Sequence, residues 1–173
     1  MGIFLMFPHR EDEFRRVGIL VMKTPDPSQC LSAFEVERTN TRQAPGFGPL
    51  LYDIAMEIAG EEGIMGDRML VSDDAERVWR FYLNSRPDVK AIQLDRNYPE
   101  QFTDTEEDDC PQGAFDYVYQ KSLSTSLDWE DIDTDTQEYK TMFLAHPMTK
   151  KYIKLGGTPV LDDLQLQKRI IYK

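Results

Sequence analysis

The stretch TRQAPGFGPLLYDIAMEIAGEEG, from Thr41 to Gly63, contains the features that decide the fold of this chain. Two prolines and two glycines fall within Pro45 to Pro49, and an apolar run with helical spacing follows directly. Proline suits the first turn of a helix, because the N–H that it lacks would have no partner there. Glycines let another molecule approach the backbone closely, and a helix N-terminus favours anions. The stretch therefore predicts a helix preceded either by a plain loop or by a loop that binds a negatively charged group.

The segments around this stretch alternate between strand and helix patterns. A second helix is predicted over residues 72–86, with Ser72 or Asp73 as its N-cap and Pro87 after its end. Apolar or alternating runs predict five strands, at Ile3 to Phe7, Val17 to Thr24, Leu31 to Thr39, Arg68 to Ser72 and Val89 to Asp95. The order strand, loop, helix, strand, helix, strand is typical of an α/β domain with some parallel pairing.

The second half of the chain has a weaker pattern. Residues 114–121 resemble a strand, and residues 136–148 resemble a helix that is interrupted at Pro147. Strand-like segments at 151–155 and 168–173 flank a turn with the sequence GGTP. We therefore expect one domain over residues 1–173, in which residues 1–95 form the core and residues 96–173 complete the sheet.

Composition narrows the classes of protein that the chain can belong to. It has 173 residues, of which 40 % are hydrophobic, as expected for one globular domain. The net charge of −11 argues against direct nucleic-acid binding, because phosphate backbones repel acidic surfaces. No segment resembles a membrane span or a signal peptide, so we expect a cytoplasmic protein.

The two cysteines, Cys30 and Cys110, allow one disulfide. Two free thiols in a reducing compartment are the preferred interpretation. With only two histidines in addition, the chain is poorly suited to a zinc site. An acidic segment that begins at Asp131 departs from a calcium loop, because Thr136 and Met142 replace the turn glycine and the closing glutamate. We therefore expect no metal.

The sequence QAPGFG, from Gln43 to Gly48, resembles the acyl-CoA pyrophosphate loop of the GNAT superfamily, the acyl-CoA-dependent N-acetyltransferases. The family pattern is Gln/Arg-x-x-Gly-x-Gly/Ala at the entry of a long helix. The resemblance covers roughly Val17 to Asp95, and the chain is also similar to acetyltransferase-like proteins of large tailed bacteriophages. It implies a mixed twisted sheet with helices on both faces. It also implies acetyl-CoA as co-substrate and transfer of an acetyl or other acyl group to an amine, in the host cytoplasm if the protein is phage-encoded.

The resemblance also implies roles for individual residues. The pyrophosphate would be bound at Gln43, Ala44, Gly46, Phe47 and Gly48, and the backbone around Val36 would align the thioester. Glu35 and Glu37 share one face of the predicted strand, and either one is a candidate general base. Two neighbouring carboxylates raise each other's pKa, which suits a base that works near neutral pH.

The second helix of the family often carries a tyrosine that donates a proton to the departing thiolate. Its pattern, Asn-x-x-Ala-x-x-x-Tyr, places Trp79 at the tyrosine when Ala75 is matched. An indole N–H is a hydrogen-bond donor but not an acid, so Tyr82, which lies one helical turn further on, is the candidate acid. Pro45 and Pro49 also lack N–H groups that could contact the pyrophosphate.

These departures keep a rival interpretation open, in which the chain is a non-catalytic GNAT-like structural or binding protein such as a virion or assembly component. A third interpretation, an acidic inhibitor that mimics nucleic acid, depends only on the net charge. For an active transferase, the acidic surface favours a cationic acceptor such as a polyamine, a lysine side chain or an aminated nucleoside. The sequence leaves open whether the chain forms a homo-oligomer.

Overall fold

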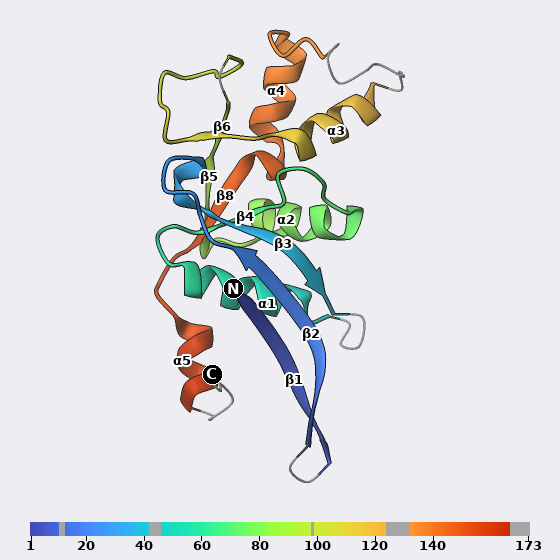
Figure 1. Ribbon diagram of the computed structural model, residues 1–173, viewed down its shortest axis with the longest axis vertical. Coiled ribbons are helices and arrows are strands. Elements are labelled where there is room, and N and C mark those ends of the chain that lie inside the picture. The colour runs from blue at the N-terminus through green and yellow to red at the C-terminus, as the bar shows by residue number, and fades with distance from the viewer. Residues whose placement is uncertain (11–12, 42–45, 98, 124–131, 167–173) are drawn as a thin grey trace.

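The computed structural model describes residues 1–10, 13–41, 46–97, 99–123 and 132–166 (Figure 1). A six-stranded sheet contains, in spatial order, β1 (Gly2–Arg10), β2 (Glu13–Lys23), β3 (Phe34–Asn40), β4 (Ile64–Gly66), β8 (Lys150–Lys154) and β5 (Val89–Gln93). Two short strands, β6 (Asp95–Arg96) and β7 (Asp109–Cys110), form a separate parallel pair. The helices are α1 (Gly48–Ala59), α2 (Asp73–Ser85), α3 (Gly113–Ser122), α4 (Gln137–Ala145) and α5 (Pro159–Leu166), with 3-10 turns η1 (Cys30–Ser32) and η3 (Pro147–Thr149).

The sheet is mixed, which confirms the predicted α/β class. β1, β2 and β3 pair antiparallel, β3 and β4 pair parallel, and β8 is antiparallel to both β4 and β5. β3, β4 and β5 therefore run in the same direction. The two crossovers, through α1 and through α2, advance the same way across the sheet, and right-handed connections then put both helices on one face.

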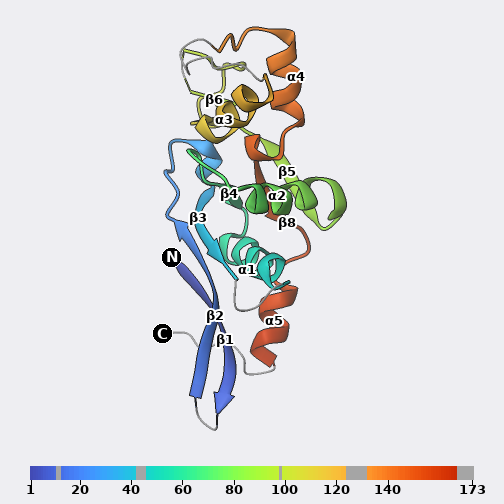
Figure 2. The ribbon, with the colours of Figure 1, turned by 90° about the vertical axis from the view of Figure 1, so that its right-hand side faces the viewer.

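The face under α1 and α2 holds the main apolar core. The ring of Tyr52 on α1 lies edge-on to Trp79 on α2, with 5.0 Å between centroids, and Trp79 stacks on Tyr152 of β8 at 5.1 Å. Figure 2 shows both helices on the same side of the strands. The sequence resemblance implied helices on both faces, but α1 and α2 share one. We call this side of the sheet the helix face.

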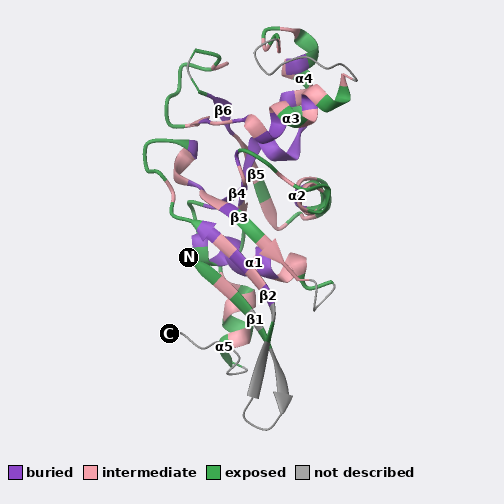
Figure 3. Ribbon diagram, turned by 45° about the vertical axis from the view of Figure 1, so that its right-hand side comes forward, coloured by how far each residue is buried: buried purple, intermediate pink, exposed green. Residues whose placement is uncertain are grey.

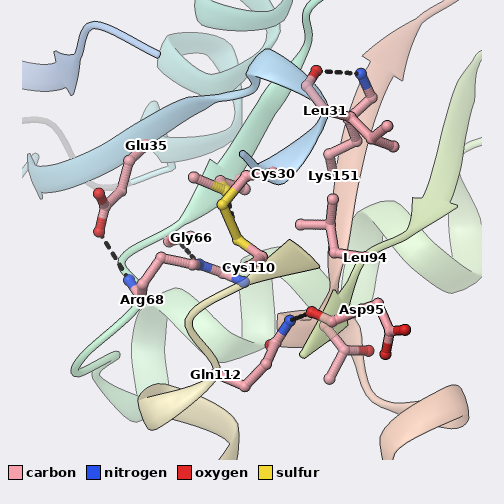
Figure 4. Close-up of a disulfide and its surroundings, with 12 residues drawn as sticks. Cys30, Leu31, Glu35, Gly66, Arg68, Leu94, Asp95, Cys110, Gln112 and Lys151 are labelled. Carbon is pink, nitrogen blue, oxygen red and sulfur yellow. Dashed lines mark hydrogen bonds between the residues drawn. A yellow bond between two sulfur atoms is a disulfide. The ribbon is translucent and has the colours of Figure 1, made fainter. Parts of the chain in front are cut away.

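The opposite face of the sheet is covered by a disulfide and short irregular segments. Side chains alternate along a strand, so Ile64 belongs to the core of the helix face while Met65 points to the other side. Met65 packs there with Ala33, Leu94 and the two cysteines. We call this side the disulfide face (Figure 4).

Cys30 and Cys110 form a disulfide with a Cα–Cα distance of 4.7 Å, so the interpretation as two free thiols is wrong. The two residues are 80 positions apart, and the sheet brings η1 and β7 together. The residues of η1, Cys30, Leu31 and Ser32, all have left-handed φ values, of 53°, 50° and 56°. This turn also delays the start of β3 to Phe34, three residues after the predicted start of the strand.

Two predicted strands are wrong. The strand near Arg68 is instead β4, which ends at Gly66, because Asp67 Oδ1 accepts the N–H groups of Met69 and Leu70 and holds the chain in a bend. The strand predicted over residues 114–121 is helix α3. Its buried aromatic residues pack against α4 rather than along a sheet, as in the contact between Phe115 and Phe143 at 5.3 Å.

The C-terminal region combines predicted and unpredicted elements. The predicted helix and strand near residues 136–155 are present as α4 and β8. The final strand-like segment, 168–173, lies outside the described residues. α5 was not predicted, and none of its residues is buried (Figure 3). Glu57 of α1 holds it in place, because its carboxylate accepts the N–H groups of Val160 and Leu161 at 3.0 and 2.7 Å.

Within the described residues, no helix has both the length and the apolar character that a membrane span requires.

Candidate functional site

The carboxyl end of β3 is an open edge of the sheet. β4 pairs with β3 only from Phe34 to Val36 and ends at Gly66, whereas β3 continues to Asn40. From Glu37 to Thr39, the described residues therefore provide no strand on the β4 side of β3. In open α/β sheets, ligands bind outside the carboxyl ends of parallel strands. This edge is the first part of the candidate site.

A bulge interrupts β3 where this edge begins. Val21 of β2 is opposite Arg38, but the next residue, Met22, is opposite Val36. Glu37 is therefore the extra residue on β3, and its side chain is exposed. Bulges turn backbone and side-chain groups away from the regular ladder and occur often beside active sites.

The loop after β3 ends in the first turn of α1. Gly46 has a φ of +90°, a conformation that favours glycine, and Gly48 begins the helix. The N-cap, Phe47, makes no side-chain capping bond, and the first turn of a helix has N–H groups without intrahelical acceptors. Among the described residues, a Cβ atom added at Gly46 would meet no atom within 4 Å, and one at Gly48 would meet only Thr41 Oγ1, at 3.9 Å. The predicted residues Gln43 and Ala44 lie outside the described residues.

The two candidate bases have different surroundings. The Glu35 side chain is 15 % exposed, and its Oε1 accepts the backbone N–H of Arg68 at 2.8 Å. Its Oε2 lies 3.7 Å from Nζ of Lys23. Glu37, at the bulge, is exposed. The structure therefore favours Glu35 over Glu37 as a positioned carboxylate. Glu35 lies where β4 still pairs with β3, and Glu37 lies where the open edge begins.

The candidate acid, Tyr82, is buried against α1. Its hydroxyl donates to the Pro49 carbonyl at 2.7 Å and lies 3.2 Å from Oδ1 of Asp53. Burial and the neighbouring Asp53 carboxylate raise the pKa of Tyr82 well above its ordinary value. Tyr82 therefore lies beside the first turn of α1, and its proton is held there by the helix backbone.

Trp79 lies at the end of β4, next to the open edge. A Cβ atom added at Gly66 would lie 3.0 Å from the indole Nε1 of Trp79 and 2.3 Å from Cε of Met148. A side chain at Gly66 would therefore displace the end of Met148 and press on the indole of Trp79, which packs directly against the backbone. Trp79 itself is 1 % exposed and has a packing role in this structure.

A depression of about 470 Å³ lies on the disulfide face beside Glu35. Its polar lining includes Lys23, Glu35 and Arg68, and its apolar lining includes Met65, Met69 and Cys30. The sequence patterns did not indicate Arg68 or Lys23 as site residues. Arg68 was predicted as the first residue of a strand, and that pattern carried no signal for a site.

Three carboxylates elsewhere could hold a divalent cation. One oxygen from each of Asp95, Asp108 and Asp109 lies within 4.8 Å of the others. Burial and the Asp95 carboxylate raise the pKa of both Asp108 and Asp109. Asp95 is also an organiser of its own loop, because its two oxygens accept the backbone N–H groups of Arg96, Phe102 and Thr103.

Comparisons of the chain with protein-family models, with curated proteins and with solved structures found no match.

Proposed function

We propose that this protein is a GNAT-like, acyl-CoA-dependent N-acyltransferase that transfers an acetyl or other acyl group to an amine. The observation that carries the proposal is the open edge of β3, whose carboxyl end lies beside the start of α1, where a Cβ atom at Gly48 would be 3.9 Å from Thr41 Oγ1. A diphosphate would bind the N–H groups in the first turn of α1, which have no intrahelical acceptor. The pantetheine arm of coenzyme A contains two amide groups, which can pair with an open strand edge as an added strand does.

The chemistry then needs a base at the inner end of this edge. The amine nitrogen attacks the thioester carbonyl carbon, the C–S bond breaks, and the thiolate leaves. The nitrogen loses one proton, for which Glu35 is the acceptor, directly or through water. The thiolate gains one proton, and Tyr82 can supply it only if its hydrogen bond to Pro49 opens. A cytoplasmic location remains a prediction.

Calorimetric titration with acetyl-CoA tests the proposal. We expect the wild-type protein to bind acetyl-CoA and Gly48→Val to lose that binding, because the branched side chain blocks the approach to the first turn of α1. The Cβ atom would meet only Thr41 Oγ1, at 3.9 Å, among the described residues, so we expect the fold to be kept. Pro49→Ala is the matched control, since it adds an N–H to the same turn and should bind acetyl-CoA at least as tightly. A wild-type protein without affinity for acetyl-CoA would exclude the transferase.

Turnover then tests the base. Glu35→Gln should reduce the rate with a good amine acceptor about 10²–10⁴-fold, and Glu37→Gln should have little effect. Equal and small losses from both substitutions would show that neither carboxylate accepts the proton.

A second candidate function is a GNAT-like binding or structural protein without catalysis. The observation that favours it is the bond between the Tyr82 hydroxyl and the Pro49 carbonyl, together with the complete burial of Trp79 at the position of the family's acid. This candidate predicts no turnover on any amine, whether or not the protein binds acetyl-CoA.

A further inference from the structure

Arg68 is a buried cation that the described residues do not neutralise. The residue is 4 % exposed. Of the five N–H donors of its guanidinium, only Nε–H has an acceptor among the described residues, the Gly66 carbonyl at 2.8 Å. Nη2 is buried and has no partner there. Figure 4 shows the side chain extending from the bend after β4 toward the disulfide.

The two nearest carboxylates, Glu35 and Asp67, attract the Arg68 charge but form no ion pair with its guanidinium. Glu35 accepts the backbone N–H of Arg68, not its guanidinium, and its other oxygen faces Lys23. Asp67 accepts the N–H groups of the bend. Within the described ranges, no carboxylate lies at ion-pair distance from the Arg68 guanidinium. Burial lowers the pKa of Arg68 to about 10, so the group is still charged at neutral pH.

The position of Arg68 is fixed by its backbone. Its N–H donates to Glu35, and its carbonyl accepts the N–H of Ala114 at 2.8 Å. The side chain is thus held at the wall of the depression instead of extending into solvent. A buried charge without a counter-ion is costly, which makes an anion from outside the chain a favourable partner.

The depression fits a small molecule with a polar end and an aliphatic body. Its volume of about 470 Å³ lies in the range of ligand pockets. Arg68 and Lys23 provide two cations, Glu35 provides one carboxylate, and Met65 and Met69 provide apolar walls. Guanidinium groups bind carboxylates with two parallel hydrogen bonds, which a planar carboxylate satisfies better than a single-point anion does.

We propose that this depression is the acceptor site and that the acceptor is a small amino acid-like molecule, bound by its carboxylate at Arg68 with its amine toward Glu35. That the depression binds a carboxylate is argued from Arg68 alone. That the depression is the acceptor site rests on the proposed transferase function. It replaces the purely cationic acceptor that the net charge suggested. The amine gives its proton to Glu35 as its nitrogen bonds to the acyl carbon, so the base and the carboxylate anchor occupy one cavity.

Calorimetry without any acyl-CoA tests the site with three probes that differ by one group each. β-Alanine has the amine and the carboxylate, propionate has only the carboxylate, and propylamine has only the amine. We expect binding of β-alanine and propionate and none of propylamine. Arg68→Met should weaken both acids at least about 10-fold, because a charge-assisted pair is lost. Glu35→Gln should weaken β-alanine and leave propionate unchanged.

Two substitutions at the exposed rim keep the test informative if Arg68→Met fails to fold. Lys23→Glu reverses a charge on a side chain that is 63 % exposed, and should weaken propionate about 10-fold. Met69→Trp, at a residue that is 70 % exposed, should reduce binding by filling the depression. Arg77→Met, at an exposed position of α2, is the control that should change nothing.

The inference is overturned if propylamine binds as well as propionate, or if propionate binding is unaffected by Lys23→Glu and Met69→Trp. Acetyl-CoA binding without binding of either acid would remove this inference and keep the transferase. Binding of both acids in a protein that does not bind acetyl-CoA would remove the transferase and keep the carboxylate site.

Discussion

The two faces of the sheet are closed in different ways. On the helix face, α1 and α2 bury aromatic side chains such as Tyr52 and Trp79 against the strands, where Trp79 stacks on Tyr152. On the disulfide face, one covalent bond joins residues 80 positions apart, and charged side chains line a depression. Regular packing therefore closes the side that maintains the fold, whereas a covalent bond leaves room for polar chemistry on the other side.

Trp79→Ala should have the largest effect on stability if the helix face carries the fold. The indole is 1 % exposed and contacts both Tyr52 and Tyr152. Its removal leaves a cavity and should lower the free energy of unfolding by about 4 kcal/mol. Urea titration followed by circular dichroism measures the change. If Trp79→Ala lowers the free energy of unfolding less than removal of the disulfide does, the disulfide face contributes more to stability than the helix face.

The double substitution Cys30→Ala and Cys110→Ala should cost about 3 kcal/mol, the usual size for one disulfide, because the chain between the two residues regains freedom in the unfolded state. The same urea titration applies, and the wild-type protein with and without a reducing agent is its control. We expect the helix face to stay intact, so the near-ultraviolet signal of Trp79 should persist below the new midpoint. Loss of that signal in the reduced native protein would show that the two faces do not fold independently.

Acid should weaken the junction between α2 and the C-terminal helices. His146 is buried, with Nε2 3.5 Å from Glu76, and burial lowers its pKa to about 4. In the unfolded chain, His146 binds a proton below about pH 6.5. In the folded chain, it binds that proton only near pH 4. Stability from this group is therefore present at pH 7 and falls by about 2 kcal/mol as the pH drops to 4.5.

The substitution His146→Asn isolates this pH effect. Nδ1 of His146 accepts the N–H of Met148 at the start of η3, and asparagine can supply a similar acceptor. Urea midpoints at pH 7 and pH 4.5 should differ less in the variant than in the wild type. An identical pH dependence in the two proteins would assign the acid sensitivity to other groups.

Tyr82→Phe should have the smallest effect, about 1 kcal/mol, because it removes one buried hydrogen bond to the Pro49 carbonyl. Thermal unfolding measures this loss. In an active transferase, a fall in turnover at unchanged acetyl-CoA affinity would add a chemical role for the hydroxyl. A stability loss without a change in turnover would show that the Tyr82 hydroxyl only links α2 to α1.

The helix face could be predicted from the sequence because its signals are local. The start of α1 follows from glycine and proline, and α2 begins at its predicted cap, Ser72, whose hydroxyl accepts the N–H of Ala75. α3 was mistaken for a strand because its aromatic residues alternate. In the helix, Phe115 and Tyr119 are buried one turn apart, whereas Tyr117 is 40 % exposed. Alternation over so few residues does not distinguish the two structures.

The disulfide face could not be predicted because its residues meet only in the folded chain. Glu35 was found from its place on a strand, but the importance of Arg68 depends on where β4 ends and on the bend that Asp67 holds. The pairing of Cys30 with Cys110 likewise depends on the position of β7 against η1. The candidate loop was identified from sequence, whereas the open edge beside it requires the register between β3 and β4.

Glu57 attaches α5 to the rest of the protein through its contacts with the first turn of that helix and with Lys154 Nζ at 2.7 Å. Since no residue of α5 is buried, its release exposes little apolar surface and leaves the sheet intact. In hydrogen-exchange terms, we expect α5 to open as a separate unit with a free energy below that of global unfolding. Its amides should exchange early while those of α1 remain protected. A protease could therefore remove the C-terminal segment from the native protein, leaving the buried carboxylate of Glu57 paired with Lys154.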